Sequence, residues 1–349
     1  MQLVINSFGT SLRRNGNLFQ IRINGKKVEI AAKKVQSILI TTGIHFSSDV
    51  LLLAVENNID VVLLDKYGDP VGRFWAGQIG STALIRRKQL EYSNNMNGLE
   101  IVKRWTVVKL DNQKAFLKDL LHRRKGKEYL FNPVIKSIEE TIKRLNNLKG
   151  SINDVRHNLM GYEGSVAALY WKILGQLPPE KFMFKKRSHR PADDPFNAML
   201  NYAYGVLYSK VERACIIAGL DPHIGFLHTD NYNKNSLVFD MIEPFRIFAD
   251  RVVLKLFTGR LCKPAMFRTE TSKAVILEKK AKELLISNFN DYLDKRVKYQ
   301  VKSSKIKKTR QIKRVDTIQA EAHSLANELM GWVNRDFPSI TEVSKLIEE

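Results

Sequence analysis

Residues 19–30 read Phe19-Gln20-Ile21-Arg22-Ile23-Asn24-Gly25-Lys26-Lys27-Val28-Glu29-Ile30, and this stretch predicts a β-hairpin. Apolar residues alternate with polar ones on both sides of Asn24-Gly25, which is typical of two half-buried strands. Asn and Gly tolerate the positive φ angles of a tight primed turn, so this dipeptide joins the two strands.

Short apolar runs extend the β structure over the first 80 residues. Residues 37–40 and 60–64 are strand candidates, and a turn at 67–70 leads to a last strand at 71–75. Between the two runs, Ser47 or Ser48 can cap a short helix.

The pattern changes after about residue 82. Apolar residues then recur at helical spacing at 107–121, 134–148, 152–174, 196–218, 244–257 and 273–293. Because strands come first and helices follow, we expect an α+β fold of two separate domains and not a parallel βαβ fold. The predicted parts are a small N-terminal β-rich domain at 1–80, a linker at 81–90 and a larger all-α domain at 91–349.

The net charge of the chain restricts the classes of partner that it is expected to bind. Of 349 residues, 57 are Lys or Arg and 36 are Asp or Glu, which gives a formal net charge of +21. Such an excess favours nucleic acid or an anionic membrane as partner. No stretch approaches the roughly 18 consecutive apolar residues that a membrane span needs, and the first twenty residues lack the pattern of a secretion signal. We therefore expect no membrane partner and a cytoplasmic location.

Several common catalytic motifs are absent from the sequence. It contains no GxxxxGK[ST] loop, no GxGxxG after a strand, no HExxH and no GxSxG. Its two cysteines, Cys215 and Cys262, lie far apart and outside any CxxC pair, which excludes a cysteine-rich zinc site. The reaction is therefore expected to use neither ATP nor a dinucleotide.

Glu163 occupies an otherwise apolar helix stripe with Val166, Tyr170 and Leu174. A carboxylate in that place must be paired, solvated in a cleft or bound to a cation, since burying it alone is prohibitive. Glycines on both sides, at 161 and 164, favour the close approach of a backbone or ligand. A boundary glutamate in a salt bridge is the simpler interpretation of the same pattern.

A second group of polar residues follows the Asp-Pro and glycine turns of 219–225. These turns deliver His228, and Asp240 and Glu243 lie three apart, so a helical turn places them on one face. Pro244 suits the first turn of the next helix. One imidazole with several carboxylates suits Mg²⁺ or Mn²⁺. Alternatively, the two acids only complement a helix dipole and His228 is a hydrogen-bonded loop residue.

Basic side chains gather in four segments. Residues 295–314 contain ten basic and no acidic side chains, and smaller clusters lie at 86–88, 123–127 and 185–190. One such run is usually a solvated face, whereas four in a chain of net charge +21 favour contact with a phosphate backbone. The predicted DNA-binding residues are Arg187, Arg190, Lys302, Lys305, Lys307, Lys308 and Arg310.

Six segments, in order along residues 1–290, together resemble the CRISPR-associated integrase family (Cas protein one). Besides the N-terminal β segments, they are Lys109-Leu110-Asp111-Asn112-Gln113, Met160-Gly161-Tyr162-Glu163-Gly164, Arg187–Leu200, Gly225-Phe226-Leu227-His228 and Ser236–Arg246. The resemblance implies that Glu163, His228 and Glu243 bind the metal. Asp240 is then an adjacent catalytic acid that binds metal or orients His228.

The resemblance also implies a reaction and partners. A DNA 3′-hydroxyl attacks a phosphodiester at the edge of a CRISPR repeat, which inserts double-stranded spacer DNA into the array without ATP. The resemblance further implies that the β-rich domain at 1–80 forms a homodimer, that the helical domain at 91–349 is catalytic, and that the dimer forms a complex with Cas protein two. Two alternatives stay open: a hydrolytic structure-selective nuclease or mobile-element integrase of the same fold, and a non-catalytic architectural DNA-binding protein.

Overall fold

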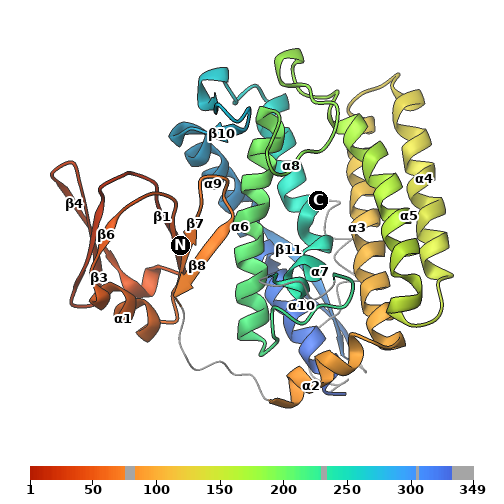
Figure 1. The fold of residues 1–349 in the computed structure, drawn as a ribbon, viewed down its shortest axis with the longest axis horizontal. Helices are drawn as coiled ribbons and strands as arrows, with labels where there is room; N and C mark the ends of the chain where they lie inside the picture. The colour runs from red at the N-terminus through yellow and green to blue at the C-terminus, as the bar shows by residue number, and fades with distance from the viewer. Residues whose placement is uncertain (75–82, 229–233, 304–305, 332–349) are drawn as a thin grey trace.

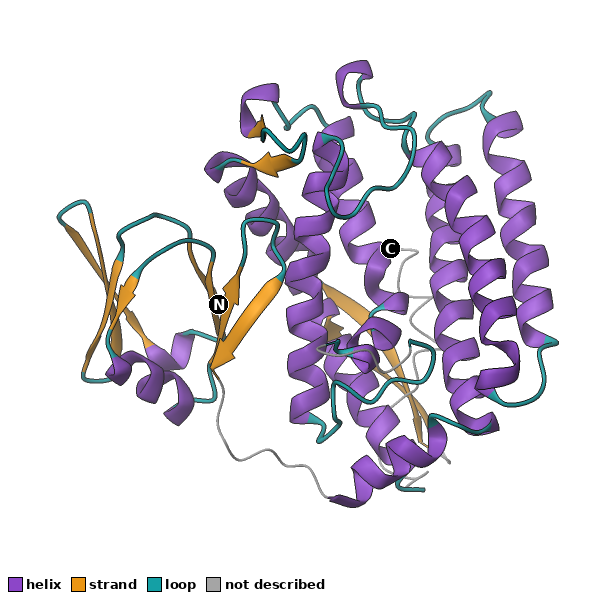
Figure 2. Cartoon of the chain, viewed as in Figure 1, coloured by secondary structure: helices purple, strands orange, loops and turns teal. Residues whose placement is uncertain are grey.

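The structure is a computed structural model that describes residues 1–74, 83–228, 234–303 and 306–331, with the backbone alone at 299–303 and 306–310. Strands dominate its first part and helices the remainder (Figures 1 and 2), which confirms the α+β class. None of the helices within the described ranges has the length and apolar character that crossing a bilayer requires.

The hairpin predicted at Asn24-Gly25 is confirmed. Strand β3 (Leu18–Ile23) pairs with β4 (Lys26–Ala31), and both turn residues have positive φ, 47° at Asn24 and 75° at Gly25. With β2 (Ser11–Asn15) and β6 (His45–Phe46) these strands form a sheet of order β4-β3-β2-β6.

A second sheet has the order β1-β5-β7-β8, formed by β1 (Gln2–Ile5), β5 (Ser37–Ile40), β7 (Asp60–Leu64) and β8 (Pro70–Phe74). Its first three strands are parallel, and helix α1 (Ser48–Glu56) connects β5 to β7. The prediction that the chain lacks parallel βαβ pairing is wrong for this sheet. The segment at 41–59 is long enough for a crossover, which needs about a dozen residues.

Nine helices follow β8 within the described residues. They are α2 (Ala83–Tyr92), α3 (Met96–His122), α4 (Glu128–Asn146), α5 (Ile152–Leu174), α6 (Pro195–Ile217), α7 (Ser236–Met241), α8 (Arg246–Thr258), α9 (Lys279–Asp294) and α10 (Arg314–Leu329). Figure 1 shows α3, α4 and α5 side by side, and α3 packs against both others. Helix α6 runs through the centre and packs against α8 and α10.

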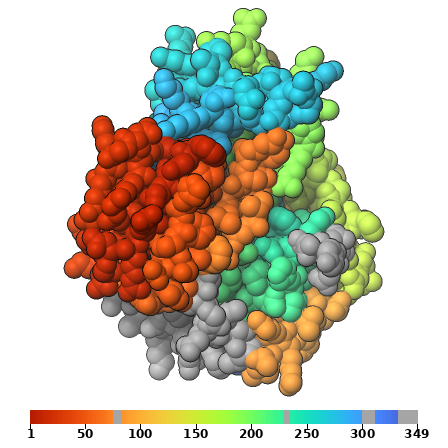
Figure 3. Space-filling model, turned by 60° about the vertical axis from the view of Figure 1, so that its left-hand side comes forward, coloured from red at the N-terminus to blue at the C-terminus, as the bar shows by residue number. Residues whose placement is uncertain are grey.

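The strand-rich part lies directly on the helices. Leu39, Val62 and Leu64 of the second sheet belong to the same buried cluster as the helical core. The turn between β7 and β8 approaches α6 so closely that a Cβ on Gly205 would lie 1.8 Å from the carbonyl oxygen of Gly68. Figure 3 shows the red and orange strands against the blue segment that carries α9, where Lys279 Nζ donates to Ser7 Oγ at 2.6 Å.

The predicted domain limits stay a prediction, although residues 83–90, assigned to a linker, belong to helix α2. Ile85 and Gln89 of this helix are buried. Gln89 donates to the Asp221 carbonyl at 3.1 Å and accepts from the Asp221 N–H at 2.9 Å. Leu84 and Leu90 of this helix are exposed whereas the polar Gln89 is buried, which is why its packing could not be predicted from apolar spacing.

The all-α description of residues 91–349 needs correction at two hairpins. Strand β9 (Phe267–Thr269) pairs with β10 (Val275–Leu277), and β11 (Arg296–Ser303) pairs with β12 (Ile306–Lys313). The basic segment 295–314 is therefore largely a two-stranded ribbon between α9 and α10. At its base, the Arg314 guanidinium lies 4.2 Å from the Tyr292 ring and Lys313 Nζ donates to Asp294 at 2.9 Å.

Candidate functional site

Two helices and a turn bring distant carboxylates together. Glu163 lies on α5, Lys109 on α3, and Glu243 begins the 3₁₀ turn Glu243–Phe245 that links α7 to α8. The side chain of Asn112, one turn beyond Lys109 on α3, donates to the Pro244 carbonyl at 2.8 Å. This bond fixes the turn, and with it Glu243, against α3.

The Lys109 ammonium forms ion pairs with both Glu163 and Glu243. Arg246, the first residue of α8, donates through Nε to the other oxygen of Glu243 at 2.8 Å. Burial raises the pKa of Glu243, but the charges of Arg246 and Lys109 outweigh it and hold the pKa below its ordinary value. These four residues, Lys109, Glu163, Glu243 and Arg246, are called the carboxylate cluster below.

His228 is held from behind by Asp240. The carboxylate accepts from His228 Nδ1 at 2.5 Å and from the N–H groups of Phe226, Leu227 and His228 at 2.6, 2.9 and 3.1 Å. Burial lowers the pKa of His228, whereas its bond to Asp240 raises it, and the net shift is upward. Gly225 is required here, because a Cβ would lie 3.0 Å from the Asp240 carboxylate and 2.7 Å from Ser236 Cβ.

A cavity of about 980 Å³ lies in front of His228. It is lined by residues 69–73 of the strand-rich part, by Arg156 and Met160 of α5, by His189 and Arg190, and by Tyr208 and Arg246. Arg246 contacts both the cavity and Glu243, so it connects the cavity to the carboxylate cluster. Arginine and histidine side chains make this wall suited to a polyanion.

The residues predicted as metal ligands are only partly assembled. Glu163 and Glu243 meet at Lys109, and His228 lines the adjacent cavity. Within the described part of the chain, no three His, Cys, Asp or Glu side chains lie close enough together to hold a metal ion. The donor types nevertheless fit Mg²⁺ or Mn²⁺, because two carboxylates already converge on one positive charge. Asp240 binds Nδ1 of His228, which leaves Nε2 of the same ring to bind metal.

Lys109, Arg246 and Asp250 support the site, and none of them was predicted from the sequence as a functional residue. The guanidinium of Arg246 lies 4.8 Å from the Tyr204 ring, and the hydroxyls of Tyr204 and Tyr170 donate to buried Asp250 at 2.5 and 2.9 Å. Burial raises the pKa of Asp250 to about 6. The signal for Lys109, Arg246 and Asp250 was a charged residue on a helix face with apolar neighbours, the same pattern that identified Glu163.

One expectation about Glu163 is wrong in part. No other backbone approaches the flanking glycines, since a Cβ on Gly161 or Gly164 would meet no protein atom within 4 Å, and the approach of a ligand stays a prediction. Glu163 does take part in a salt bridge, as the simpler interpretation held, and its partner Lys109 also pairs with Glu243, another predicted ligand.

The predicted DNA-binding residues have unequal positions. The guanidinium of Arg187 is already engaged by contacts within the protein. It donates hydrogen bonds to Asn197, at 2.9 Å, and to Asn201. It also lies against the rings of Trp171 and Tyr204. Arg190 lines the large cavity with 58% of its side chain exposed and pairs with Asp69.

The others belong to the basic ribbon. Lys302, Lys307, Lys308 and Arg310 lie on β11 and β12, and Lys305 lies outside the described residues. DNA contact by all seven residues stays a prediction.

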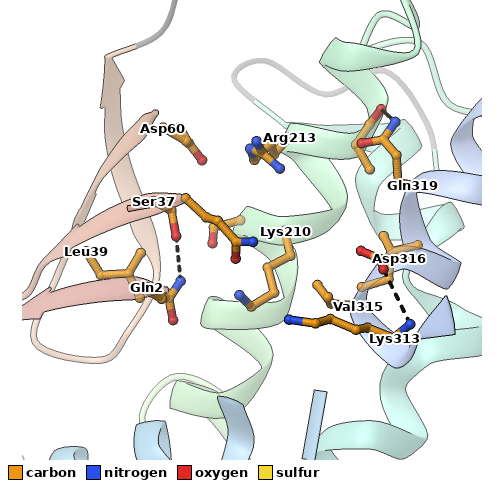
Figure 4. A pocket seen from close by; sticks show the side chains of 14 residues that line it. Gln2, Ser37, Leu39, Asp60, Lys210, Arg213, Lys313, Val315, Asp316 and Gln319 are labelled. Atoms are coloured by element: carbon orange, nitrogen blue, oxygen red, sulfur yellow. Dashed lines mark hydrogen bonds between the residues drawn. The ribbon is translucent and has the colours of Figure 1, made fainter. Parts of the chain in front are cut away.

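A second cavity, of about 200 Å³, lies where the sheet meets α6 and α10 (Figure 4). Gln2, Ser37 and Asp60 are the first residues of three neighbouring strands and share one register row. Lys210 and Arg213 of α6 face them. Burial raises the pKa of Asp60 to about 6 and lowers the pKa of Lys210 to about 8.

An ion cluster beside this cavity connects the sheet to α6. Arg73 of β8 pairs with Glu212 at 2.9 Å and with Asp60 at 3.5 Å, and it donates to the Ser209 carbonyl at 2.8 Å. Asp60, Arg73 and Glu212 are called the interdomain cluster below.

Comparisons with known proteins agree with the fold. An Archaeoglobus fulgidus protein named CRISPR-associated endonuclease Cas1 1 is 34% identical over 312 residues, which cover 86% of this chain and 90% of the relative. Among solved structures, a casposase bound to integration product has a TM-score of 0.85 at 22% identity, covering 100% of this chain and 95% of that one. A Cas6-RT-Cas1–Cas2 complex has a TM-score of 0.78 at 18% identity, covering 98% and 36%.

The family match includes the carboxylate cluster, His228 and Asp240, but not the basic ribbon. It extends over residues 3–291 and is described as CRISPR associated protein Cas1. Lys109, Glu163, His228, Asp240 and Glu243 all fall inside this range. The chain therefore belongs to the CRISPR-associated Cas1 family.

Proposed function

We propose that this protein is a metal-dependent DNA integrase of CRISPR adaptation, which joins spacer DNA to a CRISPR array. The observation that carries the proposal is the meeting of Glu163 and Glu243, from elements 80 residues apart, at one buried cation beside a basic cavity. The Cas1 family and the relative named an endonuclease support phosphodiester chemistry on DNA.

Glu163, Glu243 and Nε2 of His228 would hold the ion, which is Mg²⁺ or Mn²⁺. When bound, such an ion supplies stabilisation of charge on the phosphoryl oxygens and activation of the attacking hydroxyl. Asp240 keeps Nδ1 of His228 protonated and fixes the orientation of the ring.

The cavity wall would position the DNA. Arg190, with 58% of its side chain exposed, presents a guanidinium that can bind phosphate oxygens, and the guanidinium of Arg246 adds positive charge to the same wall. Holding a 3′-hydroxyl close to the scissile phosphate gives the rate advantage of a positioned reactant. No high-energy phosphate is consumed, because one phosphodiester replaces another.

The proposed partners are double-stranded DNA, a second copy of this chain and Cas protein two. One fold neighbour is a Cas6-RT-Cas1–Cas2 complex and another is a casposase bound to integration product, which favours Cas protein two and DNA as partners. The same residues would also serve hydrolysis, and the relative named an endonuclease keeps a nuclease as the second candidate.

The nucleophile distinguishes the two candidates. A labelled short duplex with free 3′-ends is incubated with the protein, Cas protein two, Mn²⁺ or Mg²⁺ and a plasmid carrying leader and repeat. An integrase joins the label covalently to the plasmid, and dideoxy 3′-ends stop the joining. If only nicked plasmid appears whatever the 3′-end, the protein is a hydrolytic nuclease.

A further inference from the structure

Lys109 occupies a position that a bound cation would compete for. Its ammonium contacts Glu163 from α5 and Glu243 from the turn before α8, and the residue is 8% exposed. Both carboxylates are proposed metal ligands. Their mutual repulsion at this buried place is offset by Lys109 and Arg246, so the pair is held together without a metal ion.

A second lysine on the same helix shows what a purely structural contact looks like. Lys103 is also 8% exposed, but it contacts one carboxylate, that of Glu100, at 2.8 Å. Its other partners are the backbone carbonyls of Asn146 and Leu148 at 3.4 and 3.0 Å. Lys103 thus ties α3 to the end of α4, whereas both ion pairs of Lys109 are with side chains that a metal ion would also bind.

A divalent ion and the ammonium cannot share the two carboxylates without strong repulsion at such short range. The ammonium sits on a flexible four-carbon stem and can move aside, whereas the guanidinium of Arg246 is further held by Tyr208 at 2.9 Å. Of the two cations in the carboxylate cluster, Lys109 is therefore the one that can leave.

We infer that Lys109 is a resident cation of the site: it keeps Glu163 and Glu243 together and competes with the divalent ion for them. This inference rests on the proposed function, because it takes both glutamates as metal ligands. Lys109 is then a positioning residue that sets the metal affinity of the site.

The test is a Mn²⁺ titration, followed by the electron paramagnetic resonance signal of free Mn²⁺, of wild type, Lys109→Met, Lys109→Arg and Lys103→Met. Lys109→Met is expected to bind Mn²⁺ roughly tenfold more tightly, a usual size for coupling between two ligands. Lys109→Arg is expected to bind more weakly, because the planar fork holds two carboxylates more firmly. Lys103→Met, the matched control, is expected to bind like wild type.

A lysine of merely structural importance gives a different result, because both Lys109 variants then bind Mn²⁺ more weakly; this outcome overturns the inference. If Lys109→Met does not fold without metal, the neutral polar variant Lys109→Gln takes its place: tighter Mn²⁺ binding than wild type supports the competition, and equal or weaker binding contradicts it. Failure of the proposed function is separate: wild type then binds no Mn²⁺, or Glu163→Gln binds it as well as wild type.

Discussion

The carboxylate cluster and the interdomain cluster each pair one buried and one half-buried carboxylate with cations, yet they differ in the contacts of the cation. In the first, one cation is the ammonium of Lys109, which contacts only side chains. In the second, the cation is Arg73, which pairs with two carboxylates and also donates to the Ser209 carbonyl. The first cluster can exchange its cation, whereas the second connects a strand to a helix.

Charged composition alone therefore does not separate a functional cluster from a structural one. The difference lies in the geometry of the cation and in its surroundings, since the carboxylate cluster connects through Arg246 to a cavity of about 980 Å³. Substitutions in the first should affect chemistry more than stability, and substitutions in the second should do the reverse.

The largest effect is expected from Glu163→Ala or His228→Ala. Loss of a metal ligand removes several kcal/mol of transition-state stabilisation, so strand joining should fall by about 10³-fold or more. Glu163 retains 23% side-chain exposure, and DNA affinity and thermal stability should change little. Full activity of either variant across a Mn²⁺ titration would falsify the ligand assignment.

Arg73→Met should affect stability most. It leaves the buried Asp60 and the half-buried Glu212 without their common partner, which costs up to about 3–5 kcal/mol of unfolding free energy. The matched control is Arg14→Met, which removes the exposed pair with Glu56 and should cost less than about 1 kcal/mol. Equal losses in urea denaturation would show that the interdomain cluster has no special role.

Asp60 gives the interdomain cluster a pH dependence. Its folded pKa of about 6 lies above the ordinary 3.8, so the folded state binds the proton more tightly. The contribution of this group to stability is therefore present at low pH and is lost as pH rises from about 4 to 6, by up to roughly 3 kcal/mol. The stability difference between wild type and Asp60→Asn should change across this range, and a constant difference contradicts the pKa shift.

Asp240→Asn should have an intermediate effect on chemistry. The amide can still contact the loop, but it no longer fixes the His228 ring in the tautomer that presents Nε2. Activity and metal affinity should each fall about 10- to 100-fold. Unchanged Mn²⁺ affinity in this variant would mean that Asp240 only shapes the loop.

These two clusters show that features within one short segment could be predicted from the sequence, whereas contacts between distant segments could not. Asn24-Gly25 fixes its hairpin locally, and Glu163, His228, Asp240 and Glu243 were identified from motifs within short segments. Lys109 lies in a segment that resembles the family, but its role could not be predicted, because its partners Glu163 and Glu243 lie 54 and 134 residues away in the sequence. The same holds for Arg73, whose partners lie on β7 and α6.

The basic ribbon shows a different limit. In 296–303, Val297, Tyr299 and Val301 alternate with polar residues, a strand signal that the density of positive charge concealed. If the ribbon binds phosphates, neutralising several of its charges should weaken binding to all DNA sequences alike. The slope of log K against log salt should fall by about 0.9 for each duplex phosphate that the variant no longer neutralises. An unchanged slope would assign the ribbon to a solvated surface.

The central claim is that Glu163, His228 and Glu243 converge on one divalent ion, and pulsed electron paramagnetic resonance of bound Mn²⁺ tests it most directly. Nitrogen bound to Mn²⁺ modulates the spin echo, so wild type should show an imidazole signal. His228→Ala should lose that signal at Mn²⁺ concentrations that still fill the site, whereas His189→Ala, which changes another histidine of the same cavity, should keep it. Absence of the signal in wild type, or its persistence in His228→Ala, would contradict this convergence.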